Sequence, residues 1–319
     1  MLTLVAEIAA SLGRLDAIAE QGKVPMLRRE NRIKSIHSSL AIENNTLTLD
    51  QVTAVIEGKR VLGPPREVQE VKNAFEAYEA MSSWNPSASK DLLSAHRILM
   101  RGLVDEAGHF RSRAVGIAQG KRIVHLAPPA SLVPGLMKDL LGWLKRTDAH
   151  PLITGSVFHY ELEFIHPFSD GNGRIGRLWQ TLILSRWNPL FSFLPVETVI
   201  RERQADYYKV LAACDKVGNS TAFIEFLLTA ILTALRELDT PEVAPEVTPE
   251  VGRMLQLVKS EMSRAEIMGV LGLRDEKHFR QHYQQAALAA GLLEMTLPDK
   301  PNSRLQKYRL TAKGRALLL

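Results

Sequence analysis

The stretch His166-Pro-Phe-Ser-Asp-Gly-Asn-Gly-Arg-Ile-Gly-Arg177 decides how the rest of the chain is interpreted. It follows an apolar-periodic segment, residues 152–165, and Pro167 ends that helix because the residue before a proline is disfavoured in helical geometry. Glycines and short polar side chains come next, and Arg174 opens a second amphipathic helix. The sequence therefore predicts two helices joined by a glycine-rich loop.

Such a loop has the chemistry of an anion site. Backbone N–H groups at a helix N-terminus have no intrahelical acceptor, and the helix dipole favours negative charge there. Gly171 and Gly173 carry no Cβ atom, so the backbone can approach phosphate oxygens closely. Arg174 and Arg177 lie three positions apart on one helix face and can each bind a phosphate group bidentately. Asp170 offers the oxygen ligand that Mg²⁺ prefers beside phosphates.

His166 lies at the rim of this loop, where its imidazole can accept a proton from an incoming hydroxyl. The alternative for His166 is a plain helix-capping role, and Asp170 and Asn172 also favour ordinary tight turns. The two glycines and two arginines of the same stretch favour the phosphate-binding interpretation.

The pattern His-Pro-Phe-x-Asp-Gly-Asn-Gly-Arg-x-x-Arg resembles the signature of the Fic family at every fixed position, and the wider resemblance covers about residues 30–235. It implies adenylylation, in which a protein Ser, Thr or Tyr hydroxyl attacks the α-phosphate of ATP and expels pyrophosphate. It also implies residue roles, with His166 as the general base, Asp170 as the Mg²⁺ ligand and Phe168 as an anchor in the core. Residues that would hold the phosphates are Gly171, Asn172, Gly173, Arg174 (β-phosphate) and Arg177 (γ-phosphate).

A second match lies upstream. Ser39-Leu-Ala-Ile-Glu43-Asn44 resembles the inhibitory helix of this family, with Ser39 and Glu43 four residues apart on one helical face. The resemblance implies that Glu43 pairs with Arg177 and makes this arginine unavailable to the γ-phosphate. The alternative for Glu43 is an ordinary acidic residue near a helix end.

Two further features bear on substrates. Residues 113–126 contain a Gln-Gly-Lys turn between β-prone runs, which predicts a hairpin. The resemblance implies a flap here, on which the target protein docks by strand addition. Tyr207 and Tyr208 are expected beside the adenine, the alternative being that they pack in the core.

The predicted fold class is mainly α: a Fic-type helical domain with a β-hairpin flap, and a C-terminal winged helix-turn-helix domain. Helical periodicity dominates residues 1–105, which include the inhibitory helix at about 35–45, and the predicted catalytic core spans 106–237. Three Pro-Glu-Val repeats indicate a semi-rigid linker at 238–251. Residues 252–319 then read as three helices followed by two strands, a layout that resembles a winged helix-turn-helix.

Charge separates these parts of the chain. The chain has 40 Lys and Arg residues and 35 Asp and Glu residues. From Gly252 onward there are 12 basic and 6 acidic residues, a net charge of +6, which leaves a net charge of −1 for the remainder. A basic winged helix is compatible with DNA, although many such domains bind only proteins. The candidate DNA-contacting residues are Lys277, Arg280, Gln281, His282, Gln284, Gln285, Arg304, Lys307 and Arg309.

The remaining composition is that of a globular protein, 45% hydrophobic and 24% charged. No apolar run reaches the roughly 18 residues that span a bilayer, so no membrane partner is expected. A single cysteine, Cys214, precludes an intrachain disulfide and fits a reducing, cytoplasmic location.

We therefore expect a protein adenylyltransferase that uses ATP and Mg²⁺, acts on a target protein, and is autoinhibited by Glu43, with its own hydroxyls as a further candidate acceptor. The rival from another class is an ATP-sensing, DNA-binding transcriptional regulator. The same pocket can also serve AMP removal, with Glu43 aligning a water, or a kinase-like reaction with the substrate reversed. The target and the oligomeric state, including a homodimer, stay open at this point.

Overall fold

The structure is a computed structural model that describes residues 1–19, 25–119, 122–239, 249–297, 303–311 and 314–315. It divides into two compact units, Met1–Asp239 and Thr240–Leu319. The predicted Pro-Glu-Val linker lies mostly outside the described residues. Within them, no helix combines the length and apolarity needed to cross a membrane.

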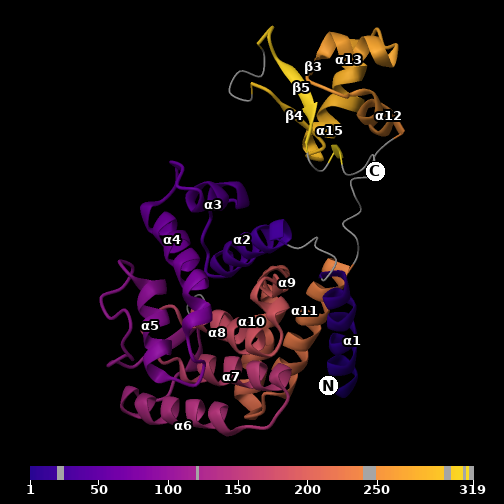
Figure 1. The fold of residues 1–319 in the computed structure, drawn as a ribbon. Coiled ribbons are helices and arrows are strands. Elements are labelled where there is room, and N and C mark those ends of the chain that lie inside the picture. The colour runs from indigo at the N-terminus through magenta and orange to yellow at the C-terminus, as the bar shows by residue number, and fades with distance from the viewer. Residues whose placement is uncertain (20–24, 120–121, 240–248, 298–302, 312–313, 316–319) are drawn as a thin grey trace. The chain divides into compact units, whose positions relative to one another are not determined.

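Among its described residues, the first unit consists of helices, connecting loops and one β-hairpin (Figure 1). Its α-helices are α1 (Leu2–Ala19), α2 (Pro25–Ile42), α3 (Leu49–Ile56), α4 (Pro65–Ala80), α5 (Ser89–Met100), α6 (Val133–Arg146), α7 (Pro151–Ile165), α8 (Asn172–Trp187), α9 (Val196–Glu202), α10 (Gln204–Val217) and α11 (Thr221–Asp239). Short 3₁₀ turns are η1 (Met81–Ser83), η2 (Ala130–Leu132) and η3 (Pro189–Ser192). The hairpin consists of the antiparallel strands β1 (Gly116–Gln119) and β2 (Arg122–Leu126).

Helices α7 and α8 pack on each other in the centre of this unit, between two apolar clusters. One cluster joins α2–α6 to these helices through residues such as Phe158 and Trp179, and the other joins them to α1 and α9–α11 through residues such as Leu184 and Phe223. Helices α1 and α11, from the two ends of the unit, lie side by side (Figure 1). The predicted N-terminal region and catalytic core therefore both contribute residues to each of these two clusters.

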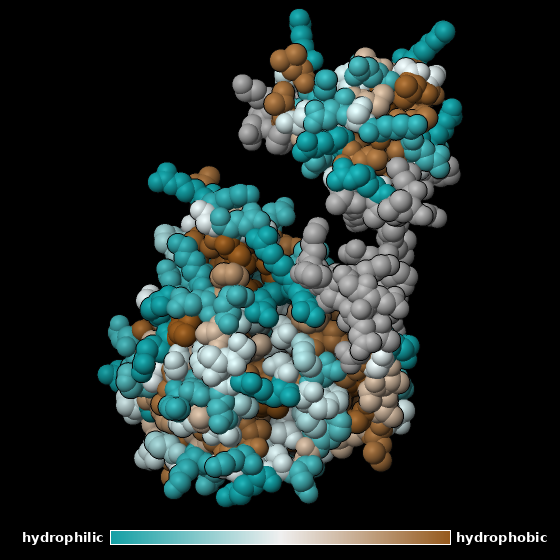
Figure 2. Space-filling model, in the orientation of Figure 1, coloured by the Kyte–Doolittle hydropathy of each residue, from teal (hydrophilic) through white to brown (hydrophobic). Residues whose placement is uncertain are grey.

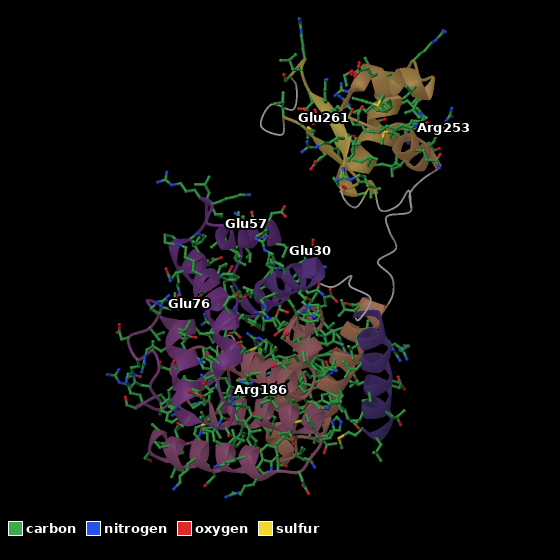
Figure 3. The ribbon with its side chains drawn as sticks, viewed as in Figure 1. Glu30, Glu57, Glu76, Arg186, Arg253 and Glu261 are labelled. Carbon is green, nitrogen blue, oxygen red and sulfur yellow. The ribbon has the colours of Figure 1, made fainter. Side chains whose placement is uncertain are left out.

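Polar contacts fix α4, α5 and α8 against each other. Arg186, near the end of α8 (Figure 3), donates to the carbonyl of Trp84 at 2.6 Å. Glu76 on α4 pairs with Arg101, which directly follows α5. The first contact holds α8, which follows the central loop, and the second joins α4 to the end of α5.

A groove of about 520 Å³ lies on the N-terminal half of α2, over an apolar floor that includes Ile33 and Phe75. Figure 2 shows this apolar surface between α2 and α4 with hydrophilic side chains around it. Two arginines at its rim are paired, Arg29 with Glu57 and Arg32 with Glu79.

One helix differs from the sequence prediction. Helix α9 was not predicted from the sequence, and it is separated from α10 at Arg203, which has φ −110° and ψ 30°. Helix α9 begins just after Pro195 and buries Val199 and Ile200 in the second apolar cluster. It is seven residues long, too short for its periodicity to stand out in the sequence.

The second unit contains helices and a small sheet around its own apolar core. Its elements are α12 (Pro249–Leu257), β3 (Met262–Ser263), α13 (Arg264–Leu271), α14 (Glu276–Phe279), the π turn η4 (Arg280–Gln284), α15 (Gln285–Ala289), β4 (Leu293–Met295) and β5 (Lys307–Leu310). The antiparallel sheet has the order β3-β5-β4. Three helical segments followed by a two-stranded wing confirm the predicted fold class. The two-residue strand β3 was not predicted, because so short a strand has no periodicity.

Candidate active site

The glycine-rich loop between α7 and α8 is closed by its own residues. His166 adopts a left-handed conformation with φ +48°, and Gly171 follows with φ +86° directly before α8. Between them, Phe168 is fully buried and stacks on His96 with ring centroids 3.7 Å apart. The predicted anchoring role of Phe168 agrees with this burial.

The side chain of Asn172 bonds the backbone of its own loop, whereas the sequence predicts that it holds phosphate groups. Its Oδ1 accepts from the Phe168 N–H and its Nδ2 donates to the Phe168 carbonyl, both at 2.9 Å. Asn172 is 2% exposed, and both polar atoms of its side chain bond the loop backbone. Asn172 therefore shapes the glycine-rich loop from inside.

His96 on α5 supports the loop from below, a role that the sequence did not suggest. Its Nδ1 accepts from the Gly108 N–H at 2.9 Å, so its Nε2 carries the proton and donates to the Asp170 carbonyl at 2.9 Å. Burial lowers the pKa of His96 to about 4, which keeps the ring neutral and this tautomer in place. Periodicity marks His96 only as a residue on an apolar helix face.

Arg111 fastens the start of the loop. Its Nε donates to the His166 carbonyl at 2.7 Å, and its Nη2 donates to the Pro128 carbonyl at 2.6 Å. Its backbone N–H donates to the Pro167 carbonyl at 2.9 Å. Arg111 is 3% exposed, so this arginine of the Gly108–Arg111 segment holds the backbone that carries His166.

Arg177 on α8 is bound by one turn at the end of α2. Its Nη2 lies 2.8 Å from Glu43 Oε1 and 2.9 Å from the Ser39 carbonyl, and its Nε donates to Ser39 Oγ at 3.0 Å. Burial alone would lower the pKa of Arg177, but the Glu43 carboxylate raises it above its ordinary value. The guanidinium thus stays charged although it is 2% exposed.

The Glu43 carboxylate also covers the loop at Gly173. A Cβ atom at Gly173 would collide with Glu43 Oε1 and would lie 2.9 Å from Arg177 Nη1. Asn44 follows with φ +67°, a left-handed conformation that asparagine tolerates better than most residues. The end of α2 thus brings a negative group to the N-terminus of α8, where an anion is favoured.

Arg174 and Asp170 belong to a separate ionic group. Arg174 Nη2 lies 3.1 Å from Asp170 Oδ1, and Arg174 Nη1 lies 3.3 Å from Glu70 Oε1 on α4. Arg66 Nη2 approaches Asp170 Oδ2 at 3.4 Å. The sequence identified Arg174 and Asp170, but Glu70 and Arg66 reach them from about a hundred positions earlier.

Comparison with known proteins assigns the chain to a family. The family model "Fic/DOC family" matches residues 85–184, and the model "Filamentation induced by cAMP protein Fic-like, C-terminal domain" matches residues 249–311. A crystal structure of a Fic family protein from Desulfovibrio desulfuricans G20 is 56% identical, with TM-score 0.75, over 98% of this chain and 96% of that one. The chain belongs to the Fic family.

Curated relatives of this Fic protein include "Protein adenylyltransferase Fic" from Nematostella vectensis, 31% identical over 65% of this chain and 49% of the relative. Another is "Protein adenylyltransferase fic-1" from Caenorhabditis elegans, 30% identical over 63% of this chain and 40% of the relative. The Fic chain thus spans about half the length of the curated relatives it matches.

The Fic site offers one carboxylate to a metal ion. No group of three or more His, Cys, Asp or Glu residues suited to metal binding occurs among the described residues. Mg²⁺ usually takes one or two carboxylates and completes its shell with substrate phosphates and water. The side chain of Asp170 is 42% exposed beside the glycine-rich loop, which fits a Mg²⁺ ion that arrives with a nucleotide.

The two tyrosines proposed for adenine binding differ. Tyr207 is 1% exposed, and its hydroxyl lies 3.1 Å from Nε2 of His159, whose Nδ1 donates to Gln180 at 2.6 Å. Burial lowers the pKa of His159 to about 3, so this buried ring is a neutral acceptor for Tyr207. Tyr207 packs in the core, which favours the alternative given for it, whereas Tyr208 is 39% exposed and stays a candidate for adenine contact.

The predicted hairpin within residues 113–126 is present as β1 and β2, with an irregular register between Ile117 and Ala118. Its turn, residues 120–121, lies outside the described residues. In the second unit, two of the residues predicted to contact DNA have partners within the protein. Gln284 is buried and accepts a hydrogen bond from Arg264, and Arg309 forms ion pairs with Glu261 and Glu294.

Proposed function

We propose that this Fic protein transfers AMP from ATP to a Ser, Thr or Tyr hydroxyl of a target protein and is inhibited by its own Glu43. The observation that carries the proposal is the 2.8 Å contact between Glu43 and Arg177 on the face of Gly173. The Glu43 carboxylate lies at the N-terminus of α8, a position that favours an anion such as a phosphate group.

In this reaction the acceptor oxygen attacks the α-phosphorus, and the bond to the β-phosphate breaks so that pyrophosphate leaves. His166, at the end of α7, takes the hydroxyl proton as general base. Arg174 and Arg177 contact the β- and γ-phosphates, and Asp170 holds Mg²⁺. The metal ion, when bound, neutralises phosphate charge.

The relatives support the same activity, since those matched in Nematostella vectensis and Caenorhabditis elegans are both named protein adenylyltransferases. The flap hairpin β1–β2 is the surface on which we propose that the target docks by strand addition. In this proposal Glu43 keeps Arg177 from the γ-phosphate, so ATP binds in an unproductive pose until the end of α2 moves.

The test uses three full-length forms, wild type, Glu43→Gly and Glu43→Gly/His166→Ala, with Mg²⁺ and ATP labelled at the α- or the γ-phosphate in a cell lysate. Protein labelling from the α-phosphate is expected at least ~10-fold stronger in Glu43→Gly than in wild type, a factor worth about 1.4 kcal/mol, and absent in the double variant. Labelling from the γ-phosphate that appears with Glu43→Gly and is lost in the double variant would instead establish a kinase-like orientation. Faster loss of AMP from pre-labelled protein in wild type than in Glu43→Gly would establish AMP removal.

A second candidate function is DNA binding by the C-terminal unit. The exposed side chains of Lys277, Arg280 and His282 project from α14 and η4, which favours a cationic surface. Full-length protein is titrated with duplex DNA at low and high salt, against Lys277→Glu/Arg280→Glu. A salt-dependent affinity lost in this variant is expected, and equal affinity of both proteins would count against DNA.

A further inference from the structure

Two carboxylates and two guanidinium groups meet beside the phosphate loop. Arg174 contacts Asp170 and Glu70, and Arg66 approaches the same two carboxylates, at 3.4 Å from Asp170 Oδ2 and 3.7 Å from Glu70 Oε1. The four formal charges cancel. The side chain of Asp170 is 42% exposed, whereas that of Glu70 is 11% exposed. The two acids therefore differ in their access to a ligand.

Glu70 is fixed from its other side. Its Oε2 accepts from Asn45 Nδ2 at 2.9 Å, and the same Asn45 nitrogen also donates to the Glu67 carbonyl at 3.2 Å. Asn45 Oδ1 in turn accepts from the Leu47 N–H. With one oxygen held by Asn45 and the other facing Arg174, the Glu70 carboxylate has a set orientation on α4.

We propose that Glu70 is a positioning residue that keeps Arg174 aimed at the β-phosphate when Asp170 turns to Mg²⁺. This inference rests on the proposed function, because that function assigns Asp170 and Arg174 to the metal and the phosphate. Among the described contacts of Arg174, Asp170 and Glu70 supply its two carboxylate partners. Once Asp170 binds a metal ion, Glu70 is the remaining one.

The physical need for such a partner follows from burial. Arg174 is 5% exposed, and an arginine this buried without a counter-charge is strongly unfavourable. Its long side chain also has many rotamers, so an unpaired guanidinium would lose its alignment before nucleotide binds. A carboxylate on helix α4 supplies the counter-charge and holds the guanidinium in one orientation. It also leaves other N–H groups of Arg174 for phosphate oxygens.

The effect of losing Glu70 on nucleotide affinity should therefore depend on the number of phosphate groups in the nucleotide. ATP and ADP have a β-phosphate for Arg174 and AMP has none, so loss of Glu70 must weaken ADP binding and spare AMP. Glu70→Gln removes the charge at nearly constant shape. The matched control is Glu67→Gln, which neutralises a carboxylate one turn earlier on α4 that accepts from Thr46 and contacts no arginine in the described structure.

The experiment measures ATP, ADP and AMP affinities by calorimetry with Mg²⁺, every variant carrying Glu43→Gly so that Arg177 is available. Glu70→Gln is expected to weaken ATP and ADP about tenfold and AMP less than twofold, with Glu67→Gln unchanged. Because Glu70 acts through Arg174, Glu70→Gln/Arg174→Ala should bind ADP no more weakly than Arg174→Ala alone. Unchanged ADP affinity, or an equal loss for AMP, overturns the inference.

Folding and catalysis are separated by two further readouts. Thermal unfolding of each variant checks that a loss of affinity is not a loss of structure. Transfer from α-labelled ATP is measured on the same preparations. Phosphate-dependent binding that needs Glu70, without AMP transfer in any form, would overturn the proposed function and leave the role of Glu70 intact.

Discussion

The guanidinium of Arg177 donates a 2.8 Å hydrogen bond to the carboxylate of Glu43, a residue 134 positions earlier in the chain. Ser39, four residues before Glu43, supplies its hydroxyl and its carbonyl to the same guanidinium. The four-residue spacing thus places both side chains on one face of α2, where they meet a single arginine. The proposed inhibition is local, because one helical turn makes these contacts.

Ser39→Ala is expected to release part of this inhibition. The variant removes one acceptor from Arg177 and leaves Glu43 in place, so about 1 kcal/mol of the contact is lost. Transfer from α-labelled ATP should rise roughly 2–10-fold, which is less than in Glu43→Gly. Ser38→Ala is the matched control, because the Ser38 hydroxyl contacts Thr198. Equal activities of Ser39→Ala and Ser38→Ala would refute the role of Ser39.

Asn172→Ala separates loop shape from direct phosphate binding. In the structure both polar atoms of Asn172 bond the backbone of Phe168, so the variant leaves a buried N–H and a buried carbonyl without partners. We expect a loss of about 2 kcal/mol in the free energy of unfolding, together with weaker ATP binding. Urea unfolding and calorimetry measure the two quantities. Wild-type stability with lost ATP binding would restore the direct contact predicted from the sequence.

Gly171→Ala tests the close approach between the backbone of Gly171, directly before α8, and the side chain of Met100. The residue has φ +86°, and a Cβ atom there would lie 2.5 Å from Met100 Sδ. Backbone strain and this collision together should lower the free energy of unfolding by about 2–4 kcal/mol. In a Met100→Ala background the collision disappears and the strain remains, so Gly171→Ala should cost less there. An equal cost in both backgrounds, measured by urea unfolding, would exclude the contact with Met100.

Local patterns carried most of what the sequence predicted. The glycine-rich loop, the 3-residue spacing of Arg174 and Arg177 and the four-residue spacing of Ser39 and Glu43 can all be recognised within a few turns of chain. Such short-range patterns also identify most helices. The hairpin within residues 113–126 was recognised in the same way, from a glycine turn between β-prone runs.

The contacts that were missed join distant segments. His96 and Asp170 are 74 positions apart, and Glu70 and Arg174 are 104 apart, so no periodicity relates the members of either pair. Tyr207 shows a second limit. Periodicity predicts a helix around it, but it does not say that this ring is buried against Phe223.

His96 makes stability depend on pH. Burial lowers its pKa in the folded protein to about 4 from an ordinary value of 6.5, so between these values the unfolded chain binds the extra proton. The free energy of unfolding therefore falls as pH drops from 6.5 toward 4, by about 2 kcal/mol for this residue at pH 5 relative to pH 7. Buried His159, with a folded pKa of about 3, acts in the same direction.

In urea unfolding at pH 7 and pH 5, His96→Gln should be less stable than wild type at pH 7 yet lose less stability on acidification, since it lacks one titrating group. Equal losses in both proteins would mean that His96 is protonated in the folded state at pH 5, which its bond from the Gly108 N–H forbids.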